Sequence, residues 1–279
     1  MANLFSGLEA FGLGKMSNLE VYASEDKNNK KSGGNETAKV AETDFIFDKS
    51  YTCPVCDKEF KSKTVKTGKV KLISADTDLR PKYQLVDSLK YDAIVCPHCG
   101  YSALNRFFNY MTSTQAKFIK ERISSSFKGL GADGEVFTYD DAIARHKLAL
   151  VNTIVKKSKL SERAYTCLKT AWLLRGKAES LLAENTETTK KEEITQLQKE
   201  ELEFLTNAYD GFLEAFAKEL FPMCGMDENT MTYLVADLAR RVGKYDESSR
   251  WISKVLISRD ANDRIKTKAR ELKELLKQS

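Results

Sequence analysis

Two cysteine pairs constrain the fold of this 279-residue chain more than any other feature of its sequence. Cys53 and Cys56 form the first pair and Cys96 and Cys99 the second, each with two residues between its cysteines. A tight turn with this spacing points both thiolates to one side, so two such turns complete a tetrahedral shell of four sulfurs. The sequence therefore predicts a metal ion bound by Cys53, Cys56, Cys96 and Cys99.

Zinc is the predicted ion, because a closed shell of four thiolates is typical of structural zinc sites. Iron in a rubredoxin-like site is the alternative, since it uses the same four-thiolate geometry. A disulfide or redox dithiol competes for any Cys-x-x-Cys pair, but no strand–helix–strand pattern surrounds either pair. His98 lies between Cys96 and Cys99, and a residue inside such a turn normally points away from the metal.

The residues around each pair predict a zinc-ribbon-like β module. A proline follows the first cysteine of each pair, and Gly100 follows the second pair; both residue types favour tight turns. Residues 51–52 and 94–95, which precede the two pairs, have strand-forming side chains. We therefore expect each cysteine turn to lie at the end of a strand.

The long segment between the pairs is rich in lysine. Residues 60–66 and 69–73 alternate in polarity around a turn at 67–68, which predicts a β-hairpin formed by these two stretches. Residues 57–90 contain nine Lys or Arg and five Asp or Glu, a net charge of +4. Such an excess suits an anionic partner, but a solvated strand face explains it as well, because lysines also protect exposed strand edges.

Composition and length predict a two-domain cytoplasmic protein. The chain is 42% hydrophobic and 30% charged, as is typical of soluble globular proteins. No apolar run reaches bilayer length, and residues 1–22 lack the basic-then-apolar order of a signal peptide. Cys167 and Cys224 lie far apart in helical surroundings and are expected to be packed thiols in a reducing compartment.

The chain divides into four predicted parts. Residues 1–22 form an apolar N-terminal segment, and residues 23–43 form a flexible linker, because their polar composition cannot bury enough apolar surface. Residues 44–110 contain both cysteine pairs and form the zinc-ribbon-like domain with its long basic insertion. Residues 111–279 form an α-helical domain.

Apolar residues recur at helical spacing from Tyr139 almost to the end of the chain, which predicts stacked helices. Gly243 and its neighbours resemble the turn between the two helices of a tetratricopeptide unit, and the small Ala236 and Ala239 permit close packing there. Ser248 stands where that repeat usually has alanine. The predicted fold class is α+β, a zinc-ribbon-like β module followed by an α-helical hairpin array resembling tetratricopeptide repeats.

Three motifs together resemble a bacterial family catalogued as domain of unknown function 2225. They read Tyr-Thr-Cys-Pro-Val-Cys at 51–56, Asp-Thr-Asp-Leu-Arg-Pro-Lys-Tyr at 76–83 and Val-Cys-Pro-His-Cys-Gly-Tyr at 95–101. The resemblance extends from about residue 44 into the C-terminal helices. It implies a cytoplasmic bacterial protein with a cysteine–metal module followed by tetratricopeptide-like helices. It implies no known activity and therefore no catalytic residue.

Three functions compete for such a chain. The first is a non-enzymatic zinc-binding interaction or scaffold protein, whose helical domain binds a protein or peptide. The second is a nucleic-acid-associated factor that uses the basic ribbon to contact phosphates. The third, a metal-dependent or redox enzyme, is disfavoured because four thiolates leave no open coordination position and no nucleophile has a matched base.

Other candidate residues have ordinary structural interpretations. Asp76, Asp78 and Asp87 are residue types that bind hard cations, but loop solvation and helix capping explain them equally. The glycine-rich stretch 129–134 lacks the Gly-Lys-Ser/Thr of a phosphate-binding loop. His146 has no ligand partner at suitable spacing and is expected to be structural.

Overall fold

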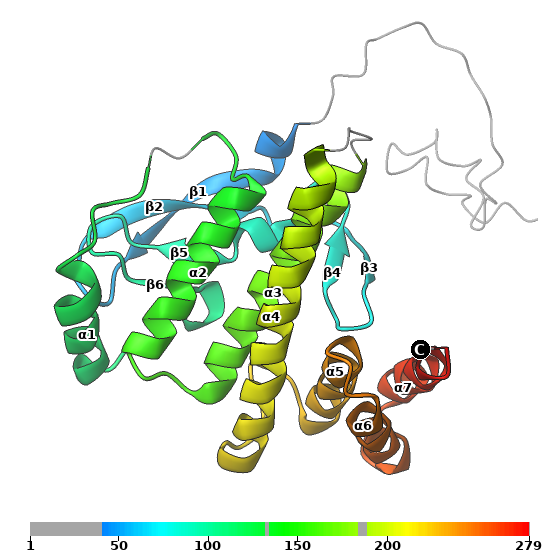
Figure 1. The fold of residues 1–279 in the computed structure, drawn as a ribbon. Coiled ribbons are helices and arrows are strands. Elements are labelled where there is room, and N and C mark those ends of the chain that lie inside the picture. Colours follow the sequence, from blue (N-terminus) through cyan, green and yellow to red (C-terminus); the bar gives the residue numbers. More distant parts are fainter. Residues whose placement is uncertain (1–40, 132–133, 184–188, 279) are drawn as a thin grey trace, which may run out of the picture. The chain divides into compact units, whose positions relative to one another are not determined.

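Strands and helices segregate along the chain, with the strands first. The computed structural model describes residues 41–131, 134–183 and 189–278. The predicted apolar segment 1–22 and nearly all of the predicted linker 23–43 lie outside these residues. The described strands all precede residue 105, and helices dominate from residue 139 onward. The predicted α+β class is confirmed (Figure 1).

The strands form three separate antiparallel pairs. They are β1 (Ile46–Thr52) with β2 (Glu59–Val65), β3 (Leu72–Ala75) with β4 (Pro81–Tyr83), and β5 (Ala93–Val95) with β6 (Ser102–Leu104). Short 3-10 turns at Glu42–Phe45, Ser88–Tyr91 and Asn105–Phe107 accompany them. Each cysteine turn therefore lies at the end of a strand, as predicted, and it joins two strands that pair with each other.

The hairpin predicted between residues 60–66 and 69–73 is wrong, because β2 pairs with β1 instead. The turn around Cys53 already reverses the chain and sets the register Tyr51↔Phe60, which stacks these two rings 5.8 Å apart. The expected turn at Gly68 exists, with φ +96°. It leads the chain away to β3, whose partner is β4.

Seven α-helices follow within the described residues. They are α1 (Ser113–Ile119), which continues as a π-helical turn (Lys120–Ser124), α2 (Tyr139–Val155), α3 (Leu160–Ala183), α4 (Thr189–Lys218), α5 (Glu228–Arg241), α6 (Tyr245–Ile257) and α7 (Asp263–Leu276). Side chains that accept a hydrogen bond from the first turn fix several of these starts. Thr138 caps α2, Asp227 caps α5 and Asn262 caps α7.

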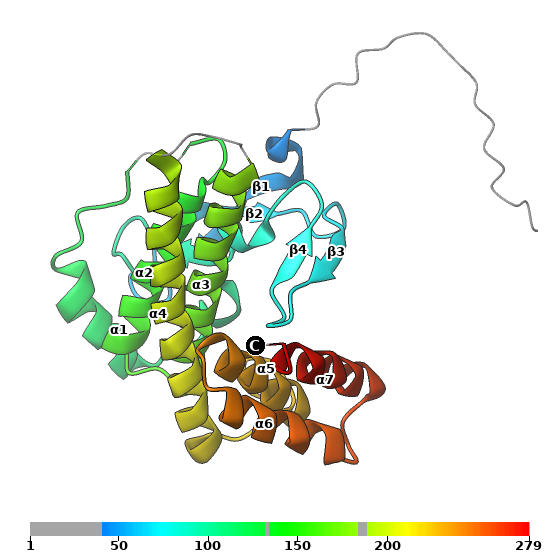
Figure 2. The same ribbon diagram turned by 45° about the vertical axis from the view of Figure 1, so that its right-hand side comes forward.

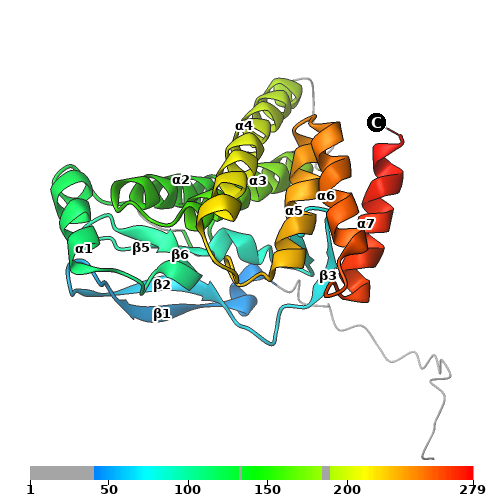
Figure 3. The ribbon, with the colours of Figure 1, turned by 90° about the horizontal axis from the view of Figure 1, so that it is seen from below.

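The helices pack in two groups, one with α2, α3 and α4 and the other with α5, α6 and α7. The groups meet where α4 contacts α5. Helix α2 lies across the β5–β6 pair, and α3 and α4 form a long antiparallel hairpin beside it (Figure 3). Gly211 permits this close approach, since a Cβ there would lie 2.9 Å from the Cβ of Ala164. Helices α5, α6 and α7 form the second group, with the tip of the β3–β4 hairpin close to α5 (Figure 2).

The turn between α5 and α6 has the helical-hairpin form that the sequence predicts. Gly243 adopts φ +79°, which glycine tolerates without steric cost. Ser248, at the position where alanine is usual, is fully buried and donates its hydroxyl to the carbonyl of Ala236 at 2.7 Å. The hydroxyl therefore joins α6 to α5 instead of weakening their contact.

Candidate metal centre

Both cysteine turns have the same backbone geometry. In the first, the amide of Asp57 donates to the carbonyl of Cys53 at 2.9 Å; in the second, the amide of Gly100 donates to that of Cys96 at 3.0 Å. The residue after the second cysteine has a positive φ in each turn, +58° at Asp57 and +73° at Gly100. The sequence indicates a positive φ only at Gly100, because an aspartate such as Asp57 is not a specific signal for a left-handed conformation.

The two turns bring all four predicted ligands together. The sulfurs of Cys53, Cys56, Cys96 and Cys99 all lie within 4.8 Å of one another. Two of these separations join opposite turns, 3.6 Å from Cys53 to Cys99 and 3.7 Å from Cys56 to Cys96. These 3.6–3.7 Å separations are far longer than the bond of about 2.0 Å in a disulfide, and all four thiols are free.

The sulfur spacing matches what a tetrahedral metal requires. Metal–sulfur bonds of about 2.3 Å in a tetrahedron place the sulfurs about 3.8 Å apart. The two short separations lie within about 0.2 Å of this value. Residues 53, 56, 96 and 99 therefore form a cluster that can hold one metal ion, and the geometry suits zinc and iron equally.

Hydrogen bonds among the sulfurs shift the pKa values of Cys53, Cys96 and Cys99. Hydrogen bonds from Cys53 and Cys99, followed by the amides of His98 and Cys99, lower the pKa of Cys96 to about 2. The hydrogen bond to Cys96 raises the pKa of Cys53 to about 12, and the hydrogen bond to Cys53 raises that of Cys99. Neighbouring thiolates repel one another at this spacing, so a bound cation is what allows all four to be ionised.

A hydrophobic cluster covers the sulfurs. Cys53 and Cys96 are fully buried, and Cys99 is nearly so, while Cys56 is half-buried. The surrounding apolar side chains come from β2, β5, α1 and the segments on either side of β6, and include Phe60, Ile94, Tyr101, Phe108 and Ile119. The cluster therefore lies inside the folded chain and not in a flexible surface loop.

Helical side chains hold the second cysteine turn in place, which the sequence does not reveal. Ser124 donates its hydroxyl to the carbonyl of Cys99 at 2.9 Å, and Asn152 donates its amide to that of Gly100 at 3.2 Å. A Cβ on Gly100 would lie 2.6 Å from the ring of Phe127. These contacts join residues distant in sequence, so no local pattern could have predicted them.

The remaining histidines and cysteines do not join the sulfur cluster. His98 is exposed and its Nε2 lies 3.3 Å from the carbonyl of Glu59. His146 is fully buried, and burial lowers its pKa to about 4. Cys167 and Cys224 are buried free thiols, as predicted, and burial raises the pKa of each to about 12.

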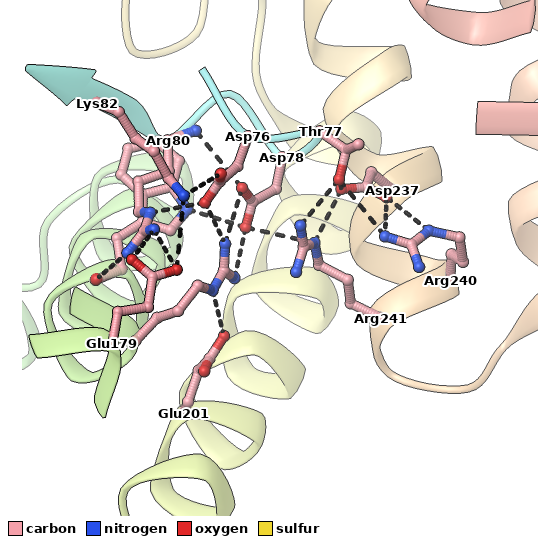
Figure 4. A network of polar contacts seen from close by, with 12 residues as sticks. Asp76, Thr77, Asp78, Arg80, Lys82, Glu179, Glu201, Asp237, Arg240 and Arg241 are labelled. Atoms are coloured by element: carbon pink, nitrogen blue, oxygen red, sulfur yellow. Dashed lines mark hydrogen bonds and ion pairs between the residues drawn. The ribbon is translucent and has the colours of Figure 1, made fainter. Parts of the chain in front are cut away.

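A second polar centre surrounds the loop between β3 and β4 (Figure 4). Asp76 pairs with Arg80 at 2.7 Å, and the fully buried Asp78 pairs with Arg175 at 2.7 Å. Burial alone would raise the pKa of Asp78, but the guanidinium of Arg175 overrides this effect and holds it below its usual value. The interpretation of Asp78 as a solvated loop residue is therefore wrong, and arginines pair with both carboxylates where a hard cation could otherwise bind.

Asp87 has the capping role considered from the sequence. It accepts the amide of Leu89 at 3.0 Å, at the start of the 3-10 turn Ser88–Tyr91, and the hydroxyl of Tyr139 at 3.1 Å. Burial raises its pKa, and the hydrogen bond from the Leu89 amide opposes that shift. Its contacts are those of a structural residue.

The lysines of the basic insertion divide into two sets. Lys63 lies 3.7 Å from Asp48 on the paired strand, and Lys66 donates to the carbonyl of Asp44 at 3.0 Å. Lys61, Lys69 and Lys71 are exposed. Only part of the positive charge of the basic insertion, including that of Lys61, Lys69 and Lys71, is therefore presented to solvent.

Comparison with known proteins identifies one family. Residues 46–276 match the family described as "Uncharacterized protein conserved in bacteria (DUF2225)". No curated protein and no solved structure shows significant similarity to the chain. Across the residues that the structure describes, no helix combines the length and apolar character needed to cross a membrane.

Proposed function

This chain belongs to the DUF2225 family of bacterial proteins, and from that premise we propose that it is a non-enzymatic zinc-binding interaction protein of the cytoplasm. In this proposal the zinc stabilises the β module, and the helices contact a protein or peptide partner. The convergence of four cysteine sulfurs carries the proposal. Four thiolates supply every ligand of a tetrahedral ion and leave no position for a substrate.

The ligand set supports a structural role for the ion. Catalytic zinc sites typically use three protein ligands and keep one position for water, whereas this cluster offers four sulfurs in largely buried surroundings. Metal binding by such a cluster contributes directly to the free energy of folding. Iron remains the alternative ion, because it takes the same ligands.

Exposed apolar side chains on the helical part support a protein partner. Leu220, after α4, is 92% exposed, and Ile257, at the end of α6, is 80% exposed. Ile257 borders a groove of about 700 Å³ that Phe216 and Trp251 also line. Apolar surface of this kind is a feature of interaction sites when it is contiguous and rimmed by polar residues.

Affinity capture from the native cell tests the proposed class of partner. Tagged wild-type protein is purified from lysates with and without nuclease, and a variant with Cys53 and Cys96 changed to serine serves as the control. We expect one set of proteins to be enriched by wild type in both lysates. Loss of every enriched protein after nuclease treatment would contradict a direct protein partner.

A nucleic-acid-associated role is the second candidate, and the exposure of Lys61, Lys69 and Lys71 favours it. Contacts between lysines and phosphates release counterions, so affinity falls steeply as salt rises. Labelled single- and double-stranded nucleic acid is titrated against wild type and against a variant with these three lysines changed to glutamine. The matched control changes Lys63 and Lys66 instead. Binding at physiological salt that only the triple variant loses would replace our proposal with this one.

A further inference from the structure

The loop between β3 and β4 lies between α3 and α5 in the way that a bound peptide would (Figure 4). The loop, residues 76–80, is closed by the amide of Asp76 donating to the carbonyl of Arg80 at 2.9 Å. Its Leu79 has φ +67° and contacts both the core around α3 and α4 and the core of α5–α7. This loop, called the tip from here on, therefore bridges the two helical groups.

Helix α5 binds both the backbone and the side chain of Thr77. The hydroxyl of Tyr233 donates to the Thr77 carbonyl at 2.7 Å, and the Thr77 hydroxyl donates to Asp237 at 2.7 Å. Arg241 donates to the same Thr77 hydroxyl at 2.8 Å. Helix α5 thus binds a main-chain group and a side-chain group of one residue in the turn, as a receptor binds a peptide ligand.

Three donors from the helices converge on the carboxylate of Asp78. The indole of Trp172 donates at 3.1 Å, Arg175 forms two hydrogen bonds at 2.7 and 3.1 Å, and Arg241 lies 3.4 Å away. Asp78 itself is fully buried. The paired geometry of the Arg175 guanidinium is specific for a carboxylate or a similar planar anion.

Helix α3 also binds the positive charge of Arg80, two residues after Asp78. Arg80 donates to both carboxylate oxygens of Glu179 on α3, at 2.7 and 2.6 Å, and to the carbonyl of Trp172 at 3.3 Å. The helical surface is therefore positive where it meets Asp78 and negative where it meets Arg80. It is complementary to a segment with an acidic residue, one apolar residue and then a basic residue.

The strands that lead to the tip contribute little to hold it. All four residues of β3 are exposed, β4 has three half-buried residues, and each strand pairs only with the other. Leu72 and Ile73 are 50% and 65% exposed. A two-stranded hairpin has marginal stability on its own, so the contacts of the tip are the main attachment of this hairpin to the helices.

We propose that the surface formed by Trp172, Arg175, Glu179, Tyr233 and Arg241 is a recognition site for a Thr-Asp-apolar-Arg turn of a partner protein, and that the tip occupies it as an internal ligand. This inference rests on the proposed function and names the chemistry of the partner. The tip is tethered beside the site, so its effective concentration there is high. A partner segment must compete with it, and the intact chain therefore binds that segment weakly until the tip is released.

Peptide binding in trans tests the site directly. The probe is a fluorescein-labelled decapeptide with the sequence of residues 74–83, and the control peptide exchanges the aspartate and arginine that correspond to Asp78 and Arg80. The proteins are the metal-loaded intact chain and a variant with residues 76–80 replaced by Gly-Ser-Gly-Ser-Gly. A milder variant, Asp78→Ser with Leu79→Gly, keeps the loop length and suits the positive φ at residue 79.

We expect saturable fluorescence anisotropy with the tip variants and at least about tenfold weaker binding to the intact chain. Adding Arg241→Gln to a tip variant, or using the exchanged peptide, should each weaken binding by about tenfold or more, as for charged hydrogen bonds. Equal binding of both peptides, or no binding to a folded tip variant, would overturn the inference. Unfolding of both tip variants would also overturn it, because the site would then not exist without the tip.

The outcome is separable from that of the proposed function. Peptide binding without any protein captured by either the intact chain or a tip variant leaves the recognition site in place and removes the protein-partner role. Capture of a partner by a chain whose tip variants ignore the peptide leaves the protein-partner role in place and moves its contact to another surface.

Discussion

Asp78 is a buried anion whose stability depends on two arginines. Arg175 and Arg241 surround its carboxylate, which has no solvent exposure. Removal of one partner from a buried ion pair leaves the other charge without compensation. A position in a loop between two short strands gave no indication of this burial in the sequence.

Asp78→Ala should therefore lower the free energy of unfolding by about 3–5 kcal/mol. Asp210 supplies the control, because its pair with Lys244 is long, at 3.7 Å, and exposed. We expect Asp210→Ala to change stability by less than about 1 kcal/mol. Urea denaturation of both variants measures the difference. Equal losses of unfolding free energy would contradict the prediction, because they would mean that water solvates Arg175 and Arg241 once Asp78 is removed.

The stability should also depend on pH through His146. Burial lowers its pKa to about 4 from an ordinary value of 6.5, so the folded state keeps the ring neutral. Between these two values the unfolded state binds a proton that the folded state does not. Stability should thus be retained above pH 6.5 and decrease by up to about 1.4 kcal/mol per unit as pH falls toward 4.

Urea midpoints at pH 7 and pH 5 test this contribution. His146→Gln should reduce the loss between the two pH values, whatever its effect on stability at pH 7. The chain has one other histidine, His98, which is exposed, and His98→Gln should leave the loss unchanged. The same pH dependence in wild type and His146→Gln would assign the effect to another group.

The second cysteine turn fits closely against the segment that follows α1. Gly100 combines a positive φ with contact to Phe127, whereas Gly68 has a positive φ and open space where a Cβ would lie. The two glycines share the conformational constraint and differ in packing. This contrast separates backbone strain from steric conflict.

Gly100→Ala should destabilise the metal-bound protein by about 1–3 kcal/mol more than Gly68→Ala, since overpacking adds to the strain. Thermal or urea unfolding of the two variants provides the comparison. Similar losses would mean that Phe127 moves away freely and that the turn is not held by the segment above it.

Loss of the cysteine metal site should reduce the stability of the β module and α1 more than that of the distant helices. Cys96→Ser removes one ligand, and the cluster that contains the sulfurs also contains Ile119 of α1. Helices α5–α7 have a separate core. We expect hydrogen exchange to accelerate in β1, β2, β5, β6 and α1, while α5–α7 keep their protection.

Cys167→Ser is the matched control for that experiment, because it changes a buried cysteine outside the sulfur cluster. It should leave exchange in the β module unchanged. A uniform loss of protection through all helices of Cys96→Ser would contradict the proposed independence.

The sequence predicts well those elements that are determined by residues close together in the chain. The cysteine spacing predicts both turns, and the 3.6-residue period predicts the helices from Tyr139 onward. The pairing of β2 was mispredicted because alternation identifies a strand without identifying its neighbour. The register instead follows from the turn around Cys53, which lies on the other side of the strand.

For the whole molecule, the limits of prediction lie in contacts that join distant residues. The ligand set of four cysteines follows from spacing alone, but the hold of Ser124 and Asn152 on the second turn does not. Likewise the motif at 76–83 gives no sign that its aspartates meet α3 and α5. The family match covers both parts of the chain and provides no activity for either.

Elemental analysis of the purified chain tests the central claim most directly. Protein prepared without chelators should contain one zinc per chain, and Cys56→Ser or Cys96→Ser should fall well below that ratio because each removes a ligand. Cys224→Ser, which changes a cysteine outside the cluster, should retain full zinc. A chain without stoichiometric metal, or one that holds iron with a rubredoxin-like visible spectrum, would contradict the account.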